Sequence, residues 1–298
     1  MASAVCELVG LLRDVQYQRC RLILQELAVE HTQLLPHLHG VTESEYLALL
    51  ESHKAAVPRA KHAALQRSAS PFVIVNGTAY VEGEDALVAF AAERTQLPRD
   101  EIVVIAAFGA GRGVFAPAQQ LALAEEALQA KAKAAAKQAL FRARQLSGNA
   151  FVFLTFAVDG VVLPRVEVEL FHRVCPRTCS NFVAFCEGKV ADVMDETRLL
   201  GYKSCAVHRV VPGGWLQAGD VAHDGQGDGP CRSLYGRSFE DESFAVSHNA
   251  VGVVVLAFGR VVSGLHTVLT IGGLETLYER PCVPCAIADC GVIASTSD

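Results

Sequence analysis

The chain has 298 residues, of which 51% are hydrophobic and 19% are charged, and its formal net charge is −6. This length and composition predict a folded protein of two domains and exclude an intrinsically disordered chain. The negative charge argues against nucleic acid as the main partner, because phosphate binding needs concentrated Lys and Arg. The long uncharged runs, 103–111 and 243–259, are too short or too polar to span a bilayer, so we expect no membrane partner.

The chain contains ten cysteines, a number that raises the question of secretion. Its first residues lack a basic region, and Glu7, Arg13 and Asp14 interrupt the apolar stretch, unlike a secretory signal peptide. We therefore expect a cytoplasmic protein with reduced thiols.

Residues 1–105 alternate strand-like and helix-like patterns, which is typical of an α/β domain. Glu7–Leu12 predicts a short buried strand, and the apolar spacing in Gln16–Glu30 predicts a helix. Two β-rich runs joined through Asn76-Gly77 predict a hairpin, because this dipeptide favours the tight turn that pairs adjacent strands. Glu84–Glu93 predicts a further helix.

Residues 114–148 are rich in strong helix formers and predict one long helix. Pro117 lies near its start and Gly148 just past its end, and the acidic residues precede the basic ones, as the helix dipole favours. Its apolar stripe is mostly alanine, which favours weak packing. We expect a connector about 45 Å long, given a rise of about 1.5 Å per residue. A protein-binding helix is the alternative.

Residues 150–298 contain short β-rich runs separated by Gly-rich turns, together with one clear helix at Cys175–Glu187 that has Pro176 in its first turn. Many short strands with few helices favour an antiparallel β-barrel.

Several motifs of this third block resemble the cyclophilins, a family of peptidyl-prolyl cis-trans isomerases. The segment AVDGVVLPRVEVELFHRVCPRTCSNFVAFCEG is similar to their first two strands and first helix, and GYKSCAVHRVVPGGWLQAGDV to their central hairpin. GPCRSLYGRSFEDESFAVSH, FGRVVSGLHTVLTI and AIADCGVI follow in family order. Residues 1–105, which contain ELVGLL and FVIVNG, resemble the thioredoxin-like N-terminal region found in one branch of that family. The resemblance implies proline-containing proteins or peptides as partners, with no cofactor and no metal.

Isomerisation needs few chemical groups. Amide resonance gives the X–Pro bond a rotation barrier of about 18–20 kcal/mol. A guanidinium that donates to the proline nitrogen stabilises the twisted state, where the nitrogen lone pair is localised. An apolar pocket must also hold the proline ring and exclude water.

The resemblance assigns these roles to the central hairpin. Arg209 matches the catalytic arginine of the family, and Gln217 matches the glutamine that binds the substrate backbone. The candidate substrate contacts are His208, Gly214, Trp215 and Leu216. Arg209 on its own, without the resemblance, favours an ordinary surface ion pair.

The hairpin departs from the family at the proline pocket. Where the family has adjacent Phe and Met after Pro-Gly, this chain has Gly214 and Trp215. Gly214 removes an aromatic wall. Trp215 either refills the space or blocks it, although tryptophan is more often buried for packing.

A larger departure lies further along, where AVGVV (250–254) runs directly into VLAFGRV (255–261). The intervening segment of the family is absent, and with it the Ala-Asn backbone clamp, a second Gln, the Phe floor and the pocket His. By alignment, Phe258 and His266 belong to a later strand and helix and do not replace them. The loss of about two strands exposes backbone edges, and each unpaired buried group costs about 1–3 kcal/mol. Such an edge can recruit another chain.

Cysteine chemistry is the remaining candidate. Cys282 and Cys285 have metal or redox spacing, but no second pair follows, so two ordinary thiols are the favoured interpretation. The thioredoxin-like block has no Cys-x-x-Cys after its first strand, and Cys20 follows within the helix, so we expect no oxidoreductase activity. Pro71 falls where that fold often has a cis-proline; an ordinary turn proline is the alternative.

We therefore predict an α+β protein: a thioredoxin-like α/β domain (1–105), a connector helix (114–148) and a cyclophilin-like antiparallel β-barrel (150–298) that is incomplete on one side. The missing segment favours an inactive or weakly active protein-binding scaffold. The alternatives are an active prolyl isomerase that uses Arg209 and a thiol or zinc protein.

Overall fold

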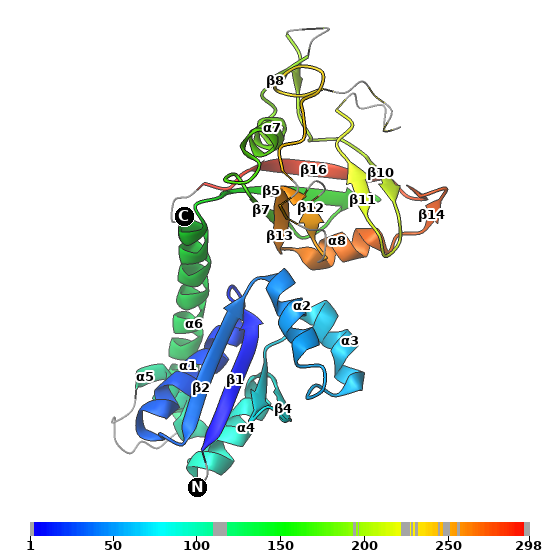
Figure 1. Ribbon diagram of the computed structural model, residues 1–298. Helices are drawn as coiled ribbons and strands as arrows, with labels where there is room; N and C mark the ends of the chain where they lie inside the picture. Colours follow the sequence, from blue (N-terminus) through cyan, green and yellow to red (C-terminus); the bar gives the residue numbers. More distant parts are fainter. Residues whose placement is uncertain are drawn as a thin grey trace. The chain divides into compact units, whose positions relative to one another are not determined.

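The computed structural model describes residues 3–109, 118–192, 195, 197–221, 227, 229, 232–243, 245–246, 251–254 and 257–294. The chain divides into two compact units, Met1–Ala143 and Arg144–Asp298 (Figure 1).

The N-terminal unit is built on a four-stranded sheet with the order β2-β1-β3-β4. β1 (Ala4–Leu11) pairs in parallel with β2 (Leu34–Val41) and antiparallel with β3 (Phe72–Val75). β3 and β4 (Ala79–Glu82) form a hairpin. The predicted strand at Glu7–Leu12 is thus confirmed as part of β1. The sequence patterns did not predict β2.

Helices cover both faces of this sheet. Successive side chains of a strand point to opposite faces, and apolar residues occur on both faces, so each face needs a covering layer. One core contains buried residues of β1, β3, α1 (Val15–Glu30), α4 (Gly83–Thr95) and α5 (Arg99–Phe108). The other joins the opposite strand face to the segment carrying α2 (Glu43–Ser52) and α3 (Arg59–Ser68). The helices predicted at Gln16–Glu30 and Glu84–Glu93 correspond to α1 and α4.

Local residues explain where two of these elements begin or turn. Asp14 is the N-cap of α1, and its side chain accepts a hydrogen bond from the backbone N–H of Gln16, as capping requires. Asn76 and Gly77 have φ values of 51° and 73°, which a tight hairpin turn needs at consecutive positions. The predicted hairpin is therefore confirmed.

The predicted connector is α6 (Ala118–Ser147), and most of it lies in the N-terminal unit. Ala124, Leu128, Ala132 and Ala136 are buried at a spacing of four residues, so they form one stripe along the helix. Ala124 and Leu128 belong to the core with α1 and α5. The expectation of weak packing was wrong for this half of the helix, because alanine allows close approach.

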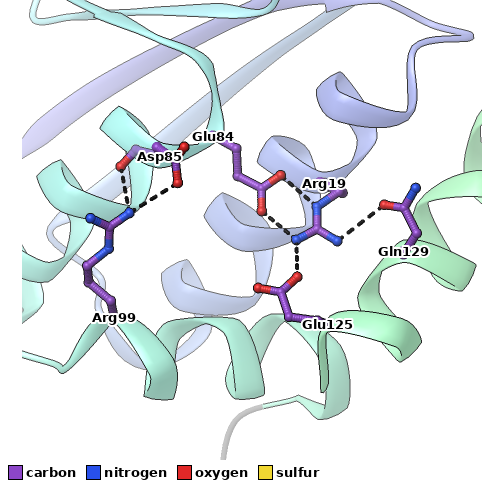
Figure 2. Close-up of polar contacts among 6 residues, drawn as sticks. All are labelled: Arg19, Glu84, Asp85, Arg99, Glu125 and Gln129. Carbon is purple, nitrogen blue, oxygen red and sulfur yellow. Dashed lines mark hydrogen bonds and ion pairs between the residues drawn. The ribbon is translucent and has the colours of Figure 1, made fainter. Parts of the chain in front are cut away.

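A buried arginine also joins these helices (Figure 2). Arg19 of α1 donates two hydrogen bonds of 2.6 Å to the carboxylate of Glu84 in α4. It donates a third of 2.6 Å to Glu125 and one of 3.3 Å to Gln129, both in α6. The hydrogen bond to Glu84 raises the pKa of Arg19, although burial opposes the shift. Sequence reasoning did not single out this cluster.

The C-terminal unit contains a six-stranded sheet, in which the main path has the order β12-β13-β7-β5-β16 and β6 (Val161–Val162) pairs with β5. The strands of the main path are β5 (Ala150–Val158), β7 (Val166–Leu170), β12 (Val253–Val254), β13 (Gly259–Ser263) and β16 (Cys285–Val292). All neighbouring pairs are antiparallel.

A separate two-stranded sheet carries the predicted hairpin, β10 (Val207–Val210) with β11 (Leu216–Ala218). The chain just before β10 is bound to β16, through an antiparallel bridge between Ala206 and Ala286. The strand order therefore runs from β12 across to β16 and on to β10 and β11. Among the described residues, β11 and β12 do not pair with each other, so the strands do not close into a barrel.

The open side lies between β11 and β12, next to the junction where the resemblance predicts a missing family segment. β12 and β13 form a direct hairpin in which Val254 pairs with Gly259, and 255–256 of the predicted junction lie outside the described residues. Other short pairs are β8 (Val190–Ala191) with β9 (Leu199–Leu200) and β14 (Thr276–Leu277) with β15 (Arg280–Pro281).

Two helices complete the unit. α7 (Pro176–Cys186) begins with Pro176 at its first position, which confirms the predicted helix. Its first N–H groups donate to Glu242, at 2.9 Å from Arg177 and 2.6 Å from Thr178. α8 (Leu265–Gly272) follows β13. Across the described part of the chain, no helix combines the length and apolar character that crossing a membrane requires.

Candidate active site

The β10–β11 hairpin brings together the two residues expected to act on the substrate. Arg209 of β10 lies directly opposite Gln217 of β11 in the antiparallel register. A register shift between Val207 and Arg209 makes His208 the extra residue of a β-bulge. The turn between the strands is closed by a 2.7 Å hydrogen bond from the N–H of Val211 to the carbonyl of Trp215.

Arg209 is engaged by a carboxylate and by an aromatic ring. Its Nε donates to Oε2 of Glu279 over 2.5 Å, and its Cζ lies 5.5 Å from the centroid of the Trp215 ring. The side chains of Arg209 and Glu279 are each 45% exposed. The prediction of a surface ion pair, made for Arg209 without the resemblance, is thus confirmed. The pair lies at the position that matches the family's catalytic arginine.

Trp215 and Gly214 do not rebuild an enclosed proline pocket. Trp215 is 52% exposed, so the expectation of a buried packing tryptophan was wrong. Its partner is the guanidinium of Arg209, and this cation–π contact keeps the ring at the surface. At Gly214, an added Cβ would lie 3.0 Å from the Val211 side chain. A side chain at this exposed position would therefore require a small shift of Val211.

The other two candidate contacts lie in different surroundings. Leu216 is partly exposed and pairs with Val210 in the register. His208 packs against Gly227, where any Cβ would overlap its ring. Both ring nitrogens of His208 are buried and, in the described part of the chain, have no hydrogen-bond partner. His208 is therefore packed against the Gly227 backbone in this structure.

Phe258 and His266, which we considered as replacements for the family's pocket residues, lie in other elements. Phe258 is buried and its ring contacts that of Phe182 in α7, with centroids 5.2 Å apart. His266 is exposed on α8. Both placements agree with the alignment, so neither residue supplies the Phe floor or the pocket His.

Sequence reasoning missed Glu279, the carboxylate that contacts Arg209. It lies in the turn between β14 and β15, with φ of 66°, and the preceding Tyr278 has φ of 49°. Two consecutive non-glycine residues with positive φ are uncommon and are held by their surroundings. Here the carbonyl of Glu279 accepts a 2.7 Å hydrogen bond from the N–H of Val210. No sequence pattern indicated this pairing, because 70 residues separate the two side chains.

The nine described cysteines form no disulfide. Burial raises the pKa of Cys6 and of Cys285 to about 11, and raises that of Cys20 well above the ordinary value. Cys282 is exposed. Within the described residues, no group of three or more His, Cys, Asp or Glu side chains is placed to hold a metal ion. The peptide bond before Pro71 is trans, as are all other bonds between described residues.

Comparison with known families identifies the class of the C-terminal unit. Residues 153–257 match the family described as cyclophilin type peptidyl-prolyl cis-trans isomerase/CLD. This part of the chain is therefore a cyclophilin-type domain with mixed α and β content, as its motifs predicted.

Individual relatives extend the likeness over about half of the chain. The mouse protein named probable inactive peptidyl-prolyl cis-trans isomerase-like 6 is 34% identical over 48% of this chain and 53% of its own length. The human protein of that name is 34% identical over 47% and 53%. Peptidyl-prolyl cis-trans isomerase CYP22 of Arabidopsis thaliana is 37% identical over 37% and 52%. The chain spans about half the length of these curated relatives.

Proposed function

We propose that this chain is a cyclophilin-like scaffold that binds proline-containing segments of other proteins at the β10–β11 hairpin and isomerises them weakly or not at all. The proposal accords with the word inactive in the names of the mouse and human relatives. Arg209 and Gln217 would contact the bound segment. The neighbouring candidate contacts are His208 beside Arg209, and Gly214, Trp215 and Leu216 before Gln217.

One observation carries the proposal: the hairpin is open where an isomerase needs an enclosed slot. Arg209, Trp215 and Gln217 are all exposed, and in the described residues β11 has β10 as its sole strand partner. A guanidinium stabilises the twisted imide best in a dry site, because water competes for its donors and favours the planar, charge-separated amide. An open site can still bind a peptide through backbone and aromatic contacts. It loses most of the stabilisation of the twisted transition state on which catalysis depends.

A protease-coupled assay tests this proposal. With a chromogenic Ala-Ala-Pro-Phe anilide, we expect the full chain to leave the isomerisation rate at the uncatalysed background. We expect the same peptide to change the fluorescence of Trp215, the only tryptophan in the chain. A large acceleration over the uncatalysed rate that disappears in Arg209→Ala would overturn the proposal of a weakly active or inactive scaffold.

An active prolyl isomerase is the second candidate. The observation that favours it is the cross-strand pairing of Arg209 with Gln217, because these two groups would donate to the proline nitrogen and bind the substrate backbone. A thiol or zinc protein is the third, and metal analysis together with thiol titration would reveal a bound zinc or a reactive pair.

We also propose that residues 1–105 form a thioredoxin-like domain without a dithiol. The proposal is supported by the order β2-β1-β3-β4, with one parallel and two antiparallel pairs and helices on both faces. Cys20 lies within α1 and is buried, so we expect no reduction of insulin disulfides by the intact chain. A cytoplasmic location remains a prediction from the sequence.

A further inference from the structure

The turn between β14 and β15 brings a carboxylate to the one guanidinium that the proposed function depends on. Glu279 accepts the Nε–H of Arg209 over 2.5 Å. The main chain of the same residue is bound to Val210, which follows Arg209 in β10. The carboxylate is therefore tethered beside Arg209 by its own backbone, at a high effective concentration.

The Arg209–Glu279 pair is exposed, so its effect on the stability of the fold is expected to be small. A carboxylate is a stronger acceptor for a guanidinium than a neutral carbonyl oxygen or a proline nitrogen. Both partners are nearly half exposed, and an exposed pair of this kind is weak enough for a ligand to displace. Glu279 takes the Nε–H of Arg209, and the Cζ of Arg209 lies 5.5 Å from the centroid of the Trp215 ring. A ligand that uses this part of the guanidinium therefore competes with contacts made within the chain.

We propose that Glu279 is a positioning residue that holds the guanidinium of Arg209 away from the bound proline segment, and so lowers the affinity of the hairpin for neutral X–Pro peptides. The inference rests on the proposed function of peptide binding at this hairpin. It also implies a preference among ligands: those that displace the carboxylate of Glu279 from Arg209 more readily bind with higher affinity.

Glu279→Gln tests the inference, because it removes the charge and keeps the size. The probe is an N-acetylated, C-amidated Ala-Ala-Pro-Phe peptide, which carries no charge, and binding is followed by Trp215 fluorescence. We expect the Kd to fall by about two- to fivefold, the range that corresponds to losing one exposed ion pair. Glu279→Asp should restore a Kd near that of the wild type, because it keeps the charge.

Glu275→Gln is the matched control. Glu275 is also exposed and lies just before β14, and its backbone carbonyl accepts from Cys282. Glu275→Gln removes one negative charge from the same segment as Glu279→Gln does, so an effect of net charge alone would appear in both variants. We expect the Glu275→Gln protein to bind the peptide with the wild-type Kd.

A spectroscopic readout separates this inference from the proposed function. In a ¹H–¹⁵N correlation spectrum, the Nε–H of Arg209 should give a shifted, slowly exchanging signal that is absent in Arg209→Lys and moves toward the ordinary arginine position in Glu279→Gln. Failure of the wild type to bind the peptide would contradict the proposed function. An unchanged Nε–H signal in Glu279→Gln, or a Kd that is not lower than that of the wild type, would overturn the role of Glu279.

Discussion

Two arginines, one in each unit, show how differently the same ion pair behaves in different surroundings. Arg19 is 11% exposed at its side chain and is bound by Glu84, Glu125 and Gln129 (Figure 2). Arg209 is 45% exposed and, within the described residues, has one carboxylate partner, Glu279. The buried arginine joins three helices, whereas the exposed one lies on a short hairpin.

The difference teaches that burial and the number of partners decide which arginine is structural. A buried charge that loses its partner leaves an uncompensated charge in a poorly solvated site, which is costly. An exposed charge that loses its partner is solvated by water at once. We therefore expect Arg19 to contribute strongly to the stability of the N-terminal unit, and Arg209 to contribute little to that of the C-terminal unit.

The largest effect is expected for Arg19→Ala, which should lower the free energy of unfolding of the N-terminal unit by about 3–5 kcal/mol. Urea unfolding followed by circular dichroism measures the loss, while Trp215 fluorescence reports the C-terminal unit. Arg99→Ala is the control, because Arg99 makes an exposed pair with Asp85 that is visible in the same view. Equal stability of Arg19→Ala and the control would refute the structural role of the cluster.

A smaller effect is expected when single carboxylates of the cluster are neutralised. Glu84→Gln should lower stability by about 1.5–3 kcal/mol, the value of hydrogen bonds to a charged group. Glu125→Gln should cost less, because Glu125 makes one of the hydrogen bonds and its side chain is 46% exposed. Thermal unfolding of the two variants gives the order, and a larger loss for Glu125→Gln would contradict the comparison.

Glu242 is an intermediate case, at the N-terminus of α7. Burial by itself would raise its pKa, but the N–H groups of Thr178 and Arg177 and the Thr178 hydroxyl hold the pKa below the ordinary value. A lowered pKa in the folded state stabilises the unit at pH values above the unfolded pKa, and this stabilisation is lost as the pH falls through the folded value.

We therefore expect Glu242→Gln to destabilise the C-terminal unit by about 1 kcal/mol at pH 7, as the loss of a helix cap does. The difference from the wild type should shrink in acid, once the pH falls from the ordinary glutamate pKa through the lowered folded value, because acid removes the same charge from the wild type. Trp215 fluorescence during urea unfolding at both pH values measures it. A difference that stays constant with pH would show that the charge of Glu242 does not stabilise α7.

The smallest effect on stability is expected for Arg209→Ala, which should stay within about 0.5 kcal/mol of the wild type, as most surface substitutions do. Because Trp215 lies beside the substituted residue, circular dichroism is the better measure here. A loss as large as that of Arg19→Ala would mean that Arg209 is structural and would remove the contrast between the two units.

Local features of the fold could be predicted well. Asn76-Gly77 predicted the β3–β4 turn because few dipeptides accept two consecutive positive φ values. Pro176 marked the start of α7 because its fixed φ suits the first helical position. The resemblance paired Arg209 with Gln217, and the register places them opposite each other. The helix at Arg99–Phe108 was missed, because its apolar run was weighed only as a membrane candidate.

Contacts between distant segments could not be predicted. Arg19 meets Glu84 and Glu125 across 65 and 106 residues of sequence. Charged residues on helices read as solvent-facing, and only the packing of α6 against α1 and α4 brings these together in a buried site. Glu279 reaches Arg209 in the same way, through the hydrogen bond that binds its turn to β10.

Sequence motifs alone indicated the cyclophilin-type class and the hairpin that carries Arg209, and they predicted that a family segment is absent after Val254. These follow from motifs and turn residues, whose effects extend over a few neighbours along the chain. Only the tertiary structure decided which arginine is buried and which carboxylate each one meets. Burial and ion pairing depend on which surfaces pack together, and that arrangement is a property of the whole fold.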